Sequence, residues 1–126
     1  MKRTDERDWV FKLIFEDSIN KIENLEQTLA NHELNDNEFI KDSLISYNEN
    51  YERIEARLVE ELKQRYKRLS RVSKAILFLS LNEIYYLDIP HQVSINEAVE
   101  LSKTYGNESD YQIINSILGK IVRKDA

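Results

Sequence analysis

Residues 70–87 read SRVSKAILFLSLNEIYYL, the most apolar stretch of the chain. Its apolar side chains cover more than one stripe of a helical wheel, as expected of a helix surrounded by others. A buried strand is the alternative for the central run at residues 75–81. The pattern continues through Asn82, Glu83 and Ile84, which makes it too long for a typical strand. We therefore predict a central, buried helix from Ser70 to Leu87. The central run at residues 75–81 is much shorter than the roughly 20 residues needed to cross a bilayer, so no membrane span is expected.

Helix is favoured before this stretch as well, because the chain has one proline and two glycines. A first helix is expected from about 5 to 19, with Thr4 as its N-cap. A second is expected over 22–31. Asn35 or Asp36 then caps a long helix that runs towards residue 63. Asparagines compete for backbone hydrogen bonds, so the sequence leaves open a break near residues 48–50.

After the central stretch, Pro90 lies in a connection. Residues 94–97 (SINE) have the spacing of a capping box, so a helix is expected to start there and to end near 105. Gly106 would supply a left-handed C-cap. A last helix starts at Ser109 or Asp110 and ends among basic residues. The sequence thus predicts an all-α fold, a single compact domain of about six or seven helices over residues 1–126. We expect two small helical bundles, about 1–66 and 67–126, packed together.

The composition excludes several classes of protein. Apolar residues make up 41% and charged residues 33% of 126 residues, which is typical of a folded domain. The absence of cysteine excludes disulfides and thiolate metal sites, and the two histidines stand alone. Acidic pairs such as Glu60 and Glu61 lie on highly charged segments, unlike the buried carboxylates of catalytic sites. We therefore expect no catalytic residues, no metal site, no cofactor and no enzyme activity.

Charge is distributed unevenly along the chain. Residues 1–62 carry 8 basic and 16 acidic residues, a net charge of −8, whereas residues 63–126 carry 10 and 7, a net charge of +3. The twelve residues from Lys63 to Lys74 contain no acid. These cations could neutralise nucleic-acid phosphates. Alternatively, they form a solvated helix junction and pair with the acidic half, which charge alone favours.

Several motifs together resemble the NusB family of bacterial transcription antitermination factors. They are residues 68–77 (RLSRVSKAIL), 82–84 (NEI), 89–90 (IP), 94–101 (SINEAVEL) and 113–118 (IINSIL), together with Arg3, Arg7, Ile14 and Phe15 near the N-terminus. The resemblance spans essentially the whole chain, and the block at 94–101 beside the proline is its most specific part. The chain departs from the family at Ile113 and Ser116, where relatives often have an aromatic residue and a glycine.

The resemblance implies a non-enzymatic, cytoplasmic RNA-binding factor. It would bind boxA-type single-stranded RNA of ribosomal RNA leader transcripts, together with ribosomal protein S-ten (NusE), within the antitermination complex of RNA polymerase. One alternative is the RNA-binding domain attached to ribosomal RNA methyltransferases. Since the chain stops at Ala126 without a catalytic domain, we expect the free-standing factor. Another alternative is a purely protein-binding helical scaffold.

Nine residues are candidates for RNA contact: Lys2, Arg3, Arg7, Arg68, Arg71, Lys74, Tyr111, Gln112 and Asn115. The N-terminal cations lie at the family's RNA-binding end, and both arginines are expected at an exposed end of the molecule. Their alternative is a frayed terminus that pairs with neighbouring acids. Tyr105 and Tyr111, beside a glycine loop, are candidates for base stacking. Core packing is expected instead for Tyr47, Tyr51 and Tyr85. Asn115 could equally read a base edge or bond a neighbouring loop.

Overall fold

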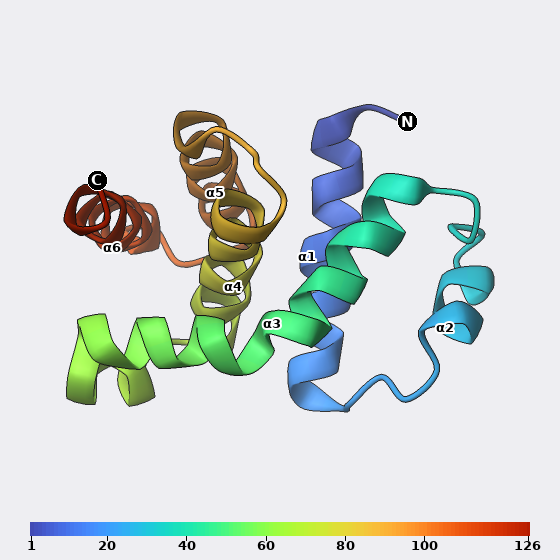
Figure 1. The fold of residues 1–126 in the computed structure, drawn as a ribbon, viewed down its shortest axis with the longest axis horizontal. Helices are drawn as coiled ribbons and strands as arrows, with labels where there is room; N and C mark the ends of the chain where they lie inside the picture. The colour runs from blue at the N-terminus through green and yellow to red at the C-terminus, as the bar shows by residue number, and fades with distance from the viewer.

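Six α-helices and one short 3-10 helix form the fold, and there is no strand (Figure 1). The structure is a computed structural model that describes residues 1–126. The elements are α1 (Arg3–Ile19), α2 (Leu25–Asn31), α3 (Glu38–Leu62), η1 (Lys63–Arg68), α4 (Arg71–Tyr86), α5 (His91–Tyr105) and α6 (Asp110–Lys124). The prediction of an all-α fold is confirmed.

The central position of α4 is also confirmed. It packs against α1, α3, α5 and α6, and in Figure 1 it lies between α1 on one side and α6 on the other. Ser70 caps the helix, because its side chain accepts a hydrogen bond from the backbone N–H of Ser73 at 3.0 Å. From Ala75 to Glu83 every residue is buried. A helix with neighbours on all sides must be apolar all round, which is the pattern that the sequence shows.

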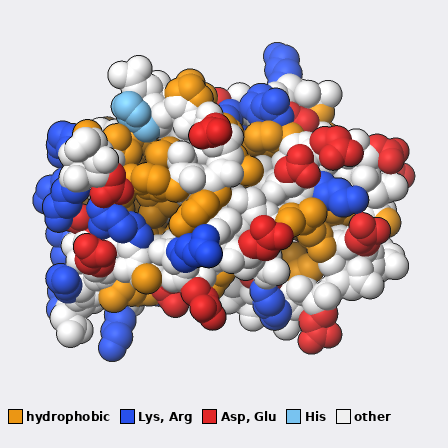
Figure 2. Space-filling model, in the orientation of Figure 1, with side chains coloured by type: hydrophobic (Ala, Val, Ile, Leu, Met, Phe, Trp, Pro, Cys, Tyr) orange, Lys and Arg blue, Asp and Glu red, His pale blue; other side chains and the backbone are white.

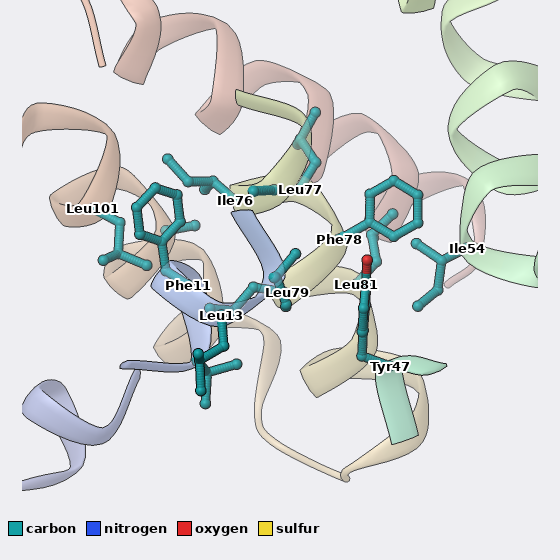
Figure 3. Close-up of a cluster of buried hydrophobic side chains, with 14 of the residues drawn as sticks. Phe11, Leu13, Tyr47, Ile54, Ile76, Leu77, Phe78, Leu79, Leu81 and Leu101 are labelled. Atoms are coloured by element: carbon teal, nitrogen blue, oxygen red, sulfur yellow. The ribbon is translucent and has the colours of Figure 1, made fainter. Parts of the chain in front are cut away.

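One continuous hydrophobic core joins the helices around α4 (Figure 3). Phe11 and Leu13 of α1, Tyr47 of α3 and Leu101 of α5 all belong to it. Leu77 lies at its centre and is completely buried. Helix α4 packs on helices from both ends of the chain. The division into two bundles, at 1–66 and 67–126, stays a prediction.

Polar side chains on α4 fix the direction in which its neighbours pack. The hydroxyl of Ser80 on α4 lies 2.9 Å from that of Ser94 on α5, and both residues are fully buried. The side-chain amide of Asn82 donates to the carbonyl of Ser43 on α3 at 3.1 Å. Buried polar groups must find partners, so these contacts favour one arrangement of helices over others.

The helix starts differ from the predicted ones. The first helix begins at Arg3 with no side-chain cap, and the hydroxyl of Thr4 donates to Glu97 at 3.2 Å instead. The cap of α3 is Asn37, one residue beyond the two that were predicted, and its side chain accepts from the backbone of Ile40. Helix α2 begins only at Leu25, because Asn24 caps it.

Helix α3 continues without a break through residues 48–50. The side-chain amide of Asn50 donates to the carbonyl of Ser46, four residues earlier. The asparagine thus adds a bond to a carbonyl of the helix and does not compete with its backbone.

The predicted capping box of α5 is wrong. The helix begins at His91, directly after Pro90, and Ser94 is already inside it. Pro90 lies just before the helix, with an extended ψ of 135°, and the hydroxyl of Ser94 is used in the core. The left-handed cap at Gly106 is also wrong, since its φ and ψ are −92° and −175°. The glycine is needed for another reason: a Cβ there would lie 2.8 Å from the carbonyl oxygen of Ser102.

The three tyrosines expected in the core have different environments. Tyr47 is 3% exposed, as predicted, but Tyr51 is 36% and Tyr85 39% exposed. Tyr85 lies at the end of α4, where its hydroxyl donates to Asp125 at 2.6 Å. Its assignment to the core is therefore wrong. Tyr51 is only partly in the core, because its ring stacks on Phe78 while 36% of the residue is exposed.

Candidate nucleic-acid interface

The acid-free window forms η1 and the first turn of α4. We call its six cations the basic cluster: Lys63, Arg65, Lys67, Arg68, Arg71 and Lys74. All are exposed except Lys74, which is half-buried. None of the six makes a salt bridge, although the acidic half supplies carboxylates to cations elsewhere. The alternative that these cations pair with the acidic half is therefore wrong. Figure 2 shows Lys and Arg gathered at one end of the molecule, over the end of α3 and α6.

Local backbone geometry brings the cluster to the surface. Helix α3 ends at Leu62, and Lys63 takes a positive φ of 53°, which turns the chain out of the helix. The following 3-10 helix has about three residues per turn and no buried residue. Its cations are therefore distributed around the helix and face solvent.

A groove separates η1 from α6. It has a volume of about 510 Å³, and its polar lining comes from Arg65 and Arg68 on one side and Gln112 and Ser116 on the other. Ile113, 46% exposed, adds apolar surface to it. The groove thus combines cations for phosphates, an amide that can pair with a base edge, and an apolar surface. Of the predicted residues, it brings Arg68 and Gln112 together.

Arg71 and Lys74 lie beside a second, smaller hollow between α1, α3 and α4. A guanidinium nitrogen of Arg71 donates to the carbonyl of Ser18 at 2.7 Å, which holds the side chain across the end of α1. The ammonium of Lys74 lies 4.5 Å from the centre of the Tyr66 ring. Leu69 lines both this hollow and the groove, so the two are adjacent.

The remaining candidates on α6 lie close to the groove. Tyr111 is half-buried and has the ammonium of Lys103 5.0 Å from its ring centre. Asn115 is exposed, and its side chain makes no hydrogen bond, so it does not tie down a neighbouring loop. Tyr105 is less available for stacking, because its ring already stacks on Phe11 at 4.8 Å and its hydroxyl bonds Asp8.

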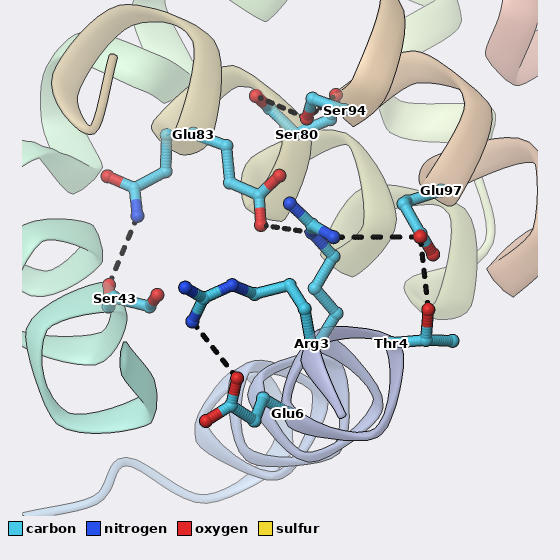
Figure 4. A network of polar contacts seen from close by, with 10 residues as sticks. Arg3, Thr4, Glu6, Ser43, Ser80, Glu83, Ser94 and Glu97 are labelled. Carbon is cyan, nitrogen blue, oxygen red and sulfur yellow. Dashed lines mark hydrogen bonds and ion pairs between the residues drawn. The ribbon is translucent and has the colours of Figure 1, made fainter. Parts of the chain in front are cut away.

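The N-terminal cations have a different environment (Figure 4). Arg3 pairs with Glu6 at 3.0 Å, and its guanidinium lies 4.0 Å from the centre of the Phe39 ring. Lys2 is exposed and has no acidic partner. These residues lie near the other end of α4, roughly 24 Å from the basic cluster at 1.5 Å per residue over its 16 residues.

Arg7 is buried, so the expectation that it lies at an exposed end is wrong. It is 4% exposed, and its guanidinium lies 2.8 Å from Glu83 and 3.6 Å from Glu97. Burial raises the pKa of Glu83 above its ordinary value, and the charge of Arg7 opposes that rise. Arg7 therefore links α1 to α4 and α5, and it does not face solvent.

Burial also raises the pKa of two tyrosines next to the basic cluster. The pKa of Tyr66 lies well above its usual range, with a further rise from its hydrogen bond to Glu55. The pKa of Tyr51 is raised by burial and by the charge of Glu55. Both rings therefore remain neutral at physiological pH and add no negative charge beside the cations.

Sequence reasoning did not single out Ile113 or Ser116 as contacts of the groove. Arg65 was among the cations of the acid-free window, although it was not one of the nine candidates. Ile113 and Ser116 lie on one face of α6, three residues apart. That face could be recognised as exposed only once the packing of α6 was known.

Two further properties limit the kinds of site that the structure contains. No three His, Cys, Asp or Glu side chains lie together as a metal ion would need. None of the helices is both long and apolar enough to span a membrane.

Comparisons with known proteins agree about the relatives of this chain. A family model described as the NusB family matches residues 4–123. The transcription antitermination protein NusB of Clostridium acetobutylicum is 36% identical over 129 residues, which cover 97% of this chain and 96% of that protein. The protein of the same name from Acetivibrio thermocellus is 40% identical, with coverage of 98% and 90%. A solved structure of T. maritima NusB superimposes with a TM-score of 0.85 at 31% identity, covering 98% of this chain and 92% of that one.

Proposed function

This chain belongs to the NusB family, and on that premise we propose that it acts in transcription antitermination by binding single-stranded RNA. The RNA is of the boxA type, from ribosomal RNA leader transcripts. The chain acts as an adaptor, with one surface for RNA and another for ribosomal protein S-ten (NusE), within the antitermination complex of RNA polymerase. The observation that carries this proposal is the basic cluster, six neighbouring cations that no carboxylate neutralises.

The chemistry of the groove supports single-stranded RNA as the ligand. Cations that have no acidic partner can neutralise phosphates and release the counterions condensed on a nucleic acid. This favours binding of any nucleic acid. An unstacked strand also exposes base edges and faces, which a helical surface can contact. Gln112 and the apolar side chain of Ile113, both in the groove, suit those parts of a base. Asn115 and Tyr111 extend the same surface along α6.

The N-terminal cations form a second, weaker contact in this proposal. Lys2 and Arg3 are exposed at the start of α1, where they meet the backbone of an RNA that continues beyond the groove. Arg7 has another role: it holds α1 against α4 and α5 through Glu83 and Glu97. Substitution of Arg7 therefore affects the fold first and RNA binding only as a consequence.

The proposed activity is binding, and we assign no reaction to the chain. The relatives are named as antitermination proteins and not as enzymes. Binding to nascent transcripts requires the compartment in which transcription takes place, so we infer a cytoplasmic location. The two alternatives from the sequence are an accessory domain of methyltransferases and a protein-binding scaffold. A protein-binding scaffold would not bind boxA RNA.

The test is binding of the purified chain to a fluorescently labelled boxA RNA, compared with an RNA of the same length and composition in scrambled order. The proposal predicts tighter binding to boxA RNA, a steep decrease with salt, and a further gain when S-ten is added. A protein scaffold would bind S-ten and neither RNA. Equal affinity for both RNAs, with or without S-ten, would reject boxA as the ligand.

A further inference from the structure

The hollow beside Arg71 and Lys74 differs from the groove because aromatic rings line it. We call it the aromatic hollow, and its walls include Tyr47, Tyr51 and Phe78. Its volume is about 250 Å³. Pockets for drug-sized ligands have roughly 300–1,000 Å³, so this hollow suits a single small ring system.

The ring of Tyr51 packs against two other rings and is still partly exposed. It stacks on Phe78 with 4.8 Å between centres and an angle of 20°, and its edge meets Tyr47 at 82°. Yet Tyr51 is 36% exposed. Figure 3 shows the two partner rings, Tyr47 from α3 and Phe78 from α4, close to each other at this point of the core. A rigid, partly exposed ring offers a face on which another flat ring can stack.

Cations without acidic partners stand at the same hollow. Arg71 has one guanidinium nitrogen bonded to the carbonyl of Ser18, and neither Arg71 nor Lys74 makes a salt bridge. Their charge is therefore available to an anion. The hydroxyl of Tyr47, in contrast, is already bonded to Asp17 at 3.0 Å. Recognition in this hollow thus depends on stacking and on positive charge.

From this arrangement we propose that the aromatic hollow binds one nucleobase with its phosphate. The base stacks on Tyr51, and the phosphate lies at Arg71 and Lys74. A base has a π-face whatever its identity, so this contact holds the strand without reading its sequence. The inference rests on the proposed function if the base belongs to RNA, but a free mononucleotide presents the same chemistry. Sequence is then read elsewhere, at the groove between η1 and α6.

Three variants test the contact. Tyr51→Leu removes the aromatic face and keeps an apolar side chain, whereas Tyr51→Phe keeps the face. Tyr86→Leu is the matched control, because Tyr86 is 37% exposed and does not line the hollow. Affinity for boxA RNA is measured by fluorescence anisotropy over a range of salt concentrations, and circular dichroism checks that each variant is folded.

We expect Tyr51→Leu to bind RNA roughly 5- to 150-fold more weakly, the range that base–aromatic stacking supports, with an unchanged salt slope. Tyr51→Phe and Tyr86→Leu should bind as the unmodified chain does. If Tyr51→Leu binds as tightly as Tyr86→Leu, the inference is overturned while RNA binding stands. If Tyr51→Leu does not fold, a loss of affinity in Tyr51→Phe equally overturns it.

A second measurement separates the two sources of the base. Uridine monophosphate is added to the unmodified chain, and the ring signals of Tyr51 and Phe78 are followed by nuclear magnetic resonance. Shifts with boxA RNA alone support a base of the strand, and shifts with the mononucleotide in a chain that binds no RNA support a free nucleotide site. No shift with either ligand overturns the inference. Failure of RNA binding alone overturns only the proposed function.

Discussion

The guanidinium of Arg7 on α1 and the carboxylate of Glu83 on α4 lie 2.8 Å apart, and both side chains are at most 5% exposed. The pair joins the N-terminal helix to the central one, and Glu97 of α5 lies 3.6 Å from the same guanidinium. Once the folded structure contains such a buried pair, its stability depends on keeping both partners. If one partner is removed, the other is left as an uncompensated charge in the core.

Arg7→Ala should therefore destabilise the fold by about 3–5 kcal/mol. Without the arginine, the pKa of Glu83, already raised by burial, rises further. A carboxyl with a raised pKa in the folded state contributes stability below its ordinary value of 4.5, which is lost as the pH rises. The destabilisation should therefore be larger at neutral pH than near pH 4.5. Unfolding in denaturant at both pH values measures it.

Arg3→Ala is the control for that experiment. Arg3 pairs with Glu6 at the surface, where ion pairs contribute about 0–1 kcal/mol. If the two variants were equally stable, the buried pair would not have the structural role that we assign to it.

The core around α4 makes a second prediction. Leu77 is completely buried, so Leu77→Ala should cost about 2–5 kcal/mol of unfolding free energy, from the lost transfer energy and from the cavity left behind. Val59→Ala, at a position that is 42% exposed, should change it by less than about 0.5 kcal/mol. A cost below about 1 kcal/mol for Leu77→Ala would place the core elsewhere.

The contact between Tyr85 and Asp125 near the C-terminus predicts a change in stability at alkaline pH. Burial and the hydrogen bond to Asp125 raise the pKa of Tyr85 to about 12 from an ordinary 10.0. The tyrosine thus contributes stability that is fully present below pH 10 and is lost as the pH rises through about 12. Asp125→Ala should lower this pKa towards 10, as an ultraviolet titration of the tyrosinate would show. Tyr85→Phe identifies the step that belongs to Tyr85, and a midpoint that Asp125→Ala leaves unchanged would exclude the contact.

Most helices could be predicted because their signals are local. The apolar run of α4 lies within a few residues, and the predicted helix agrees with the structure. The cap of α3 could not be chosen, since several polar residues precede the helix. Asn37 also donates to Glu6 at 2.7 Å, a contact across 31 residues that no local pattern contains.

The candidate site was predictable only in part for the same reason. The absence of acids in the basic cluster is a local property, and it indicated an exposed cationic surface, which the structure contains. The burial of Arg7 depends on Glu83, 76 residues further along the chain. Likewise, Arg65 and Gln112 belong to one groove only because α6 packs beside η1. Such relationships follow from tertiary packing, which periodicity and motifs do not contain.

The most direct test of the central claim is the salt dependence of boxA RNA binding by the variant Arg65→Ala/Arg68→Ala. Each phosphate contact with a single strand contributes about 0.7 to the slope of log affinity against log salt. The control is Lys21→Ala/Lys41→Ala, which removes the same charge from residues that pair with acids elsewhere.

If the basic cluster binds the RNA backbone, the double arginine variant should bind more weakly, and its slope should decrease by roughly one to one and a half units. The control should keep the slope of the unmodified chain. Identical slopes and affinities for the two folded variants would contradict the assignment of RNA binding to the basic cluster.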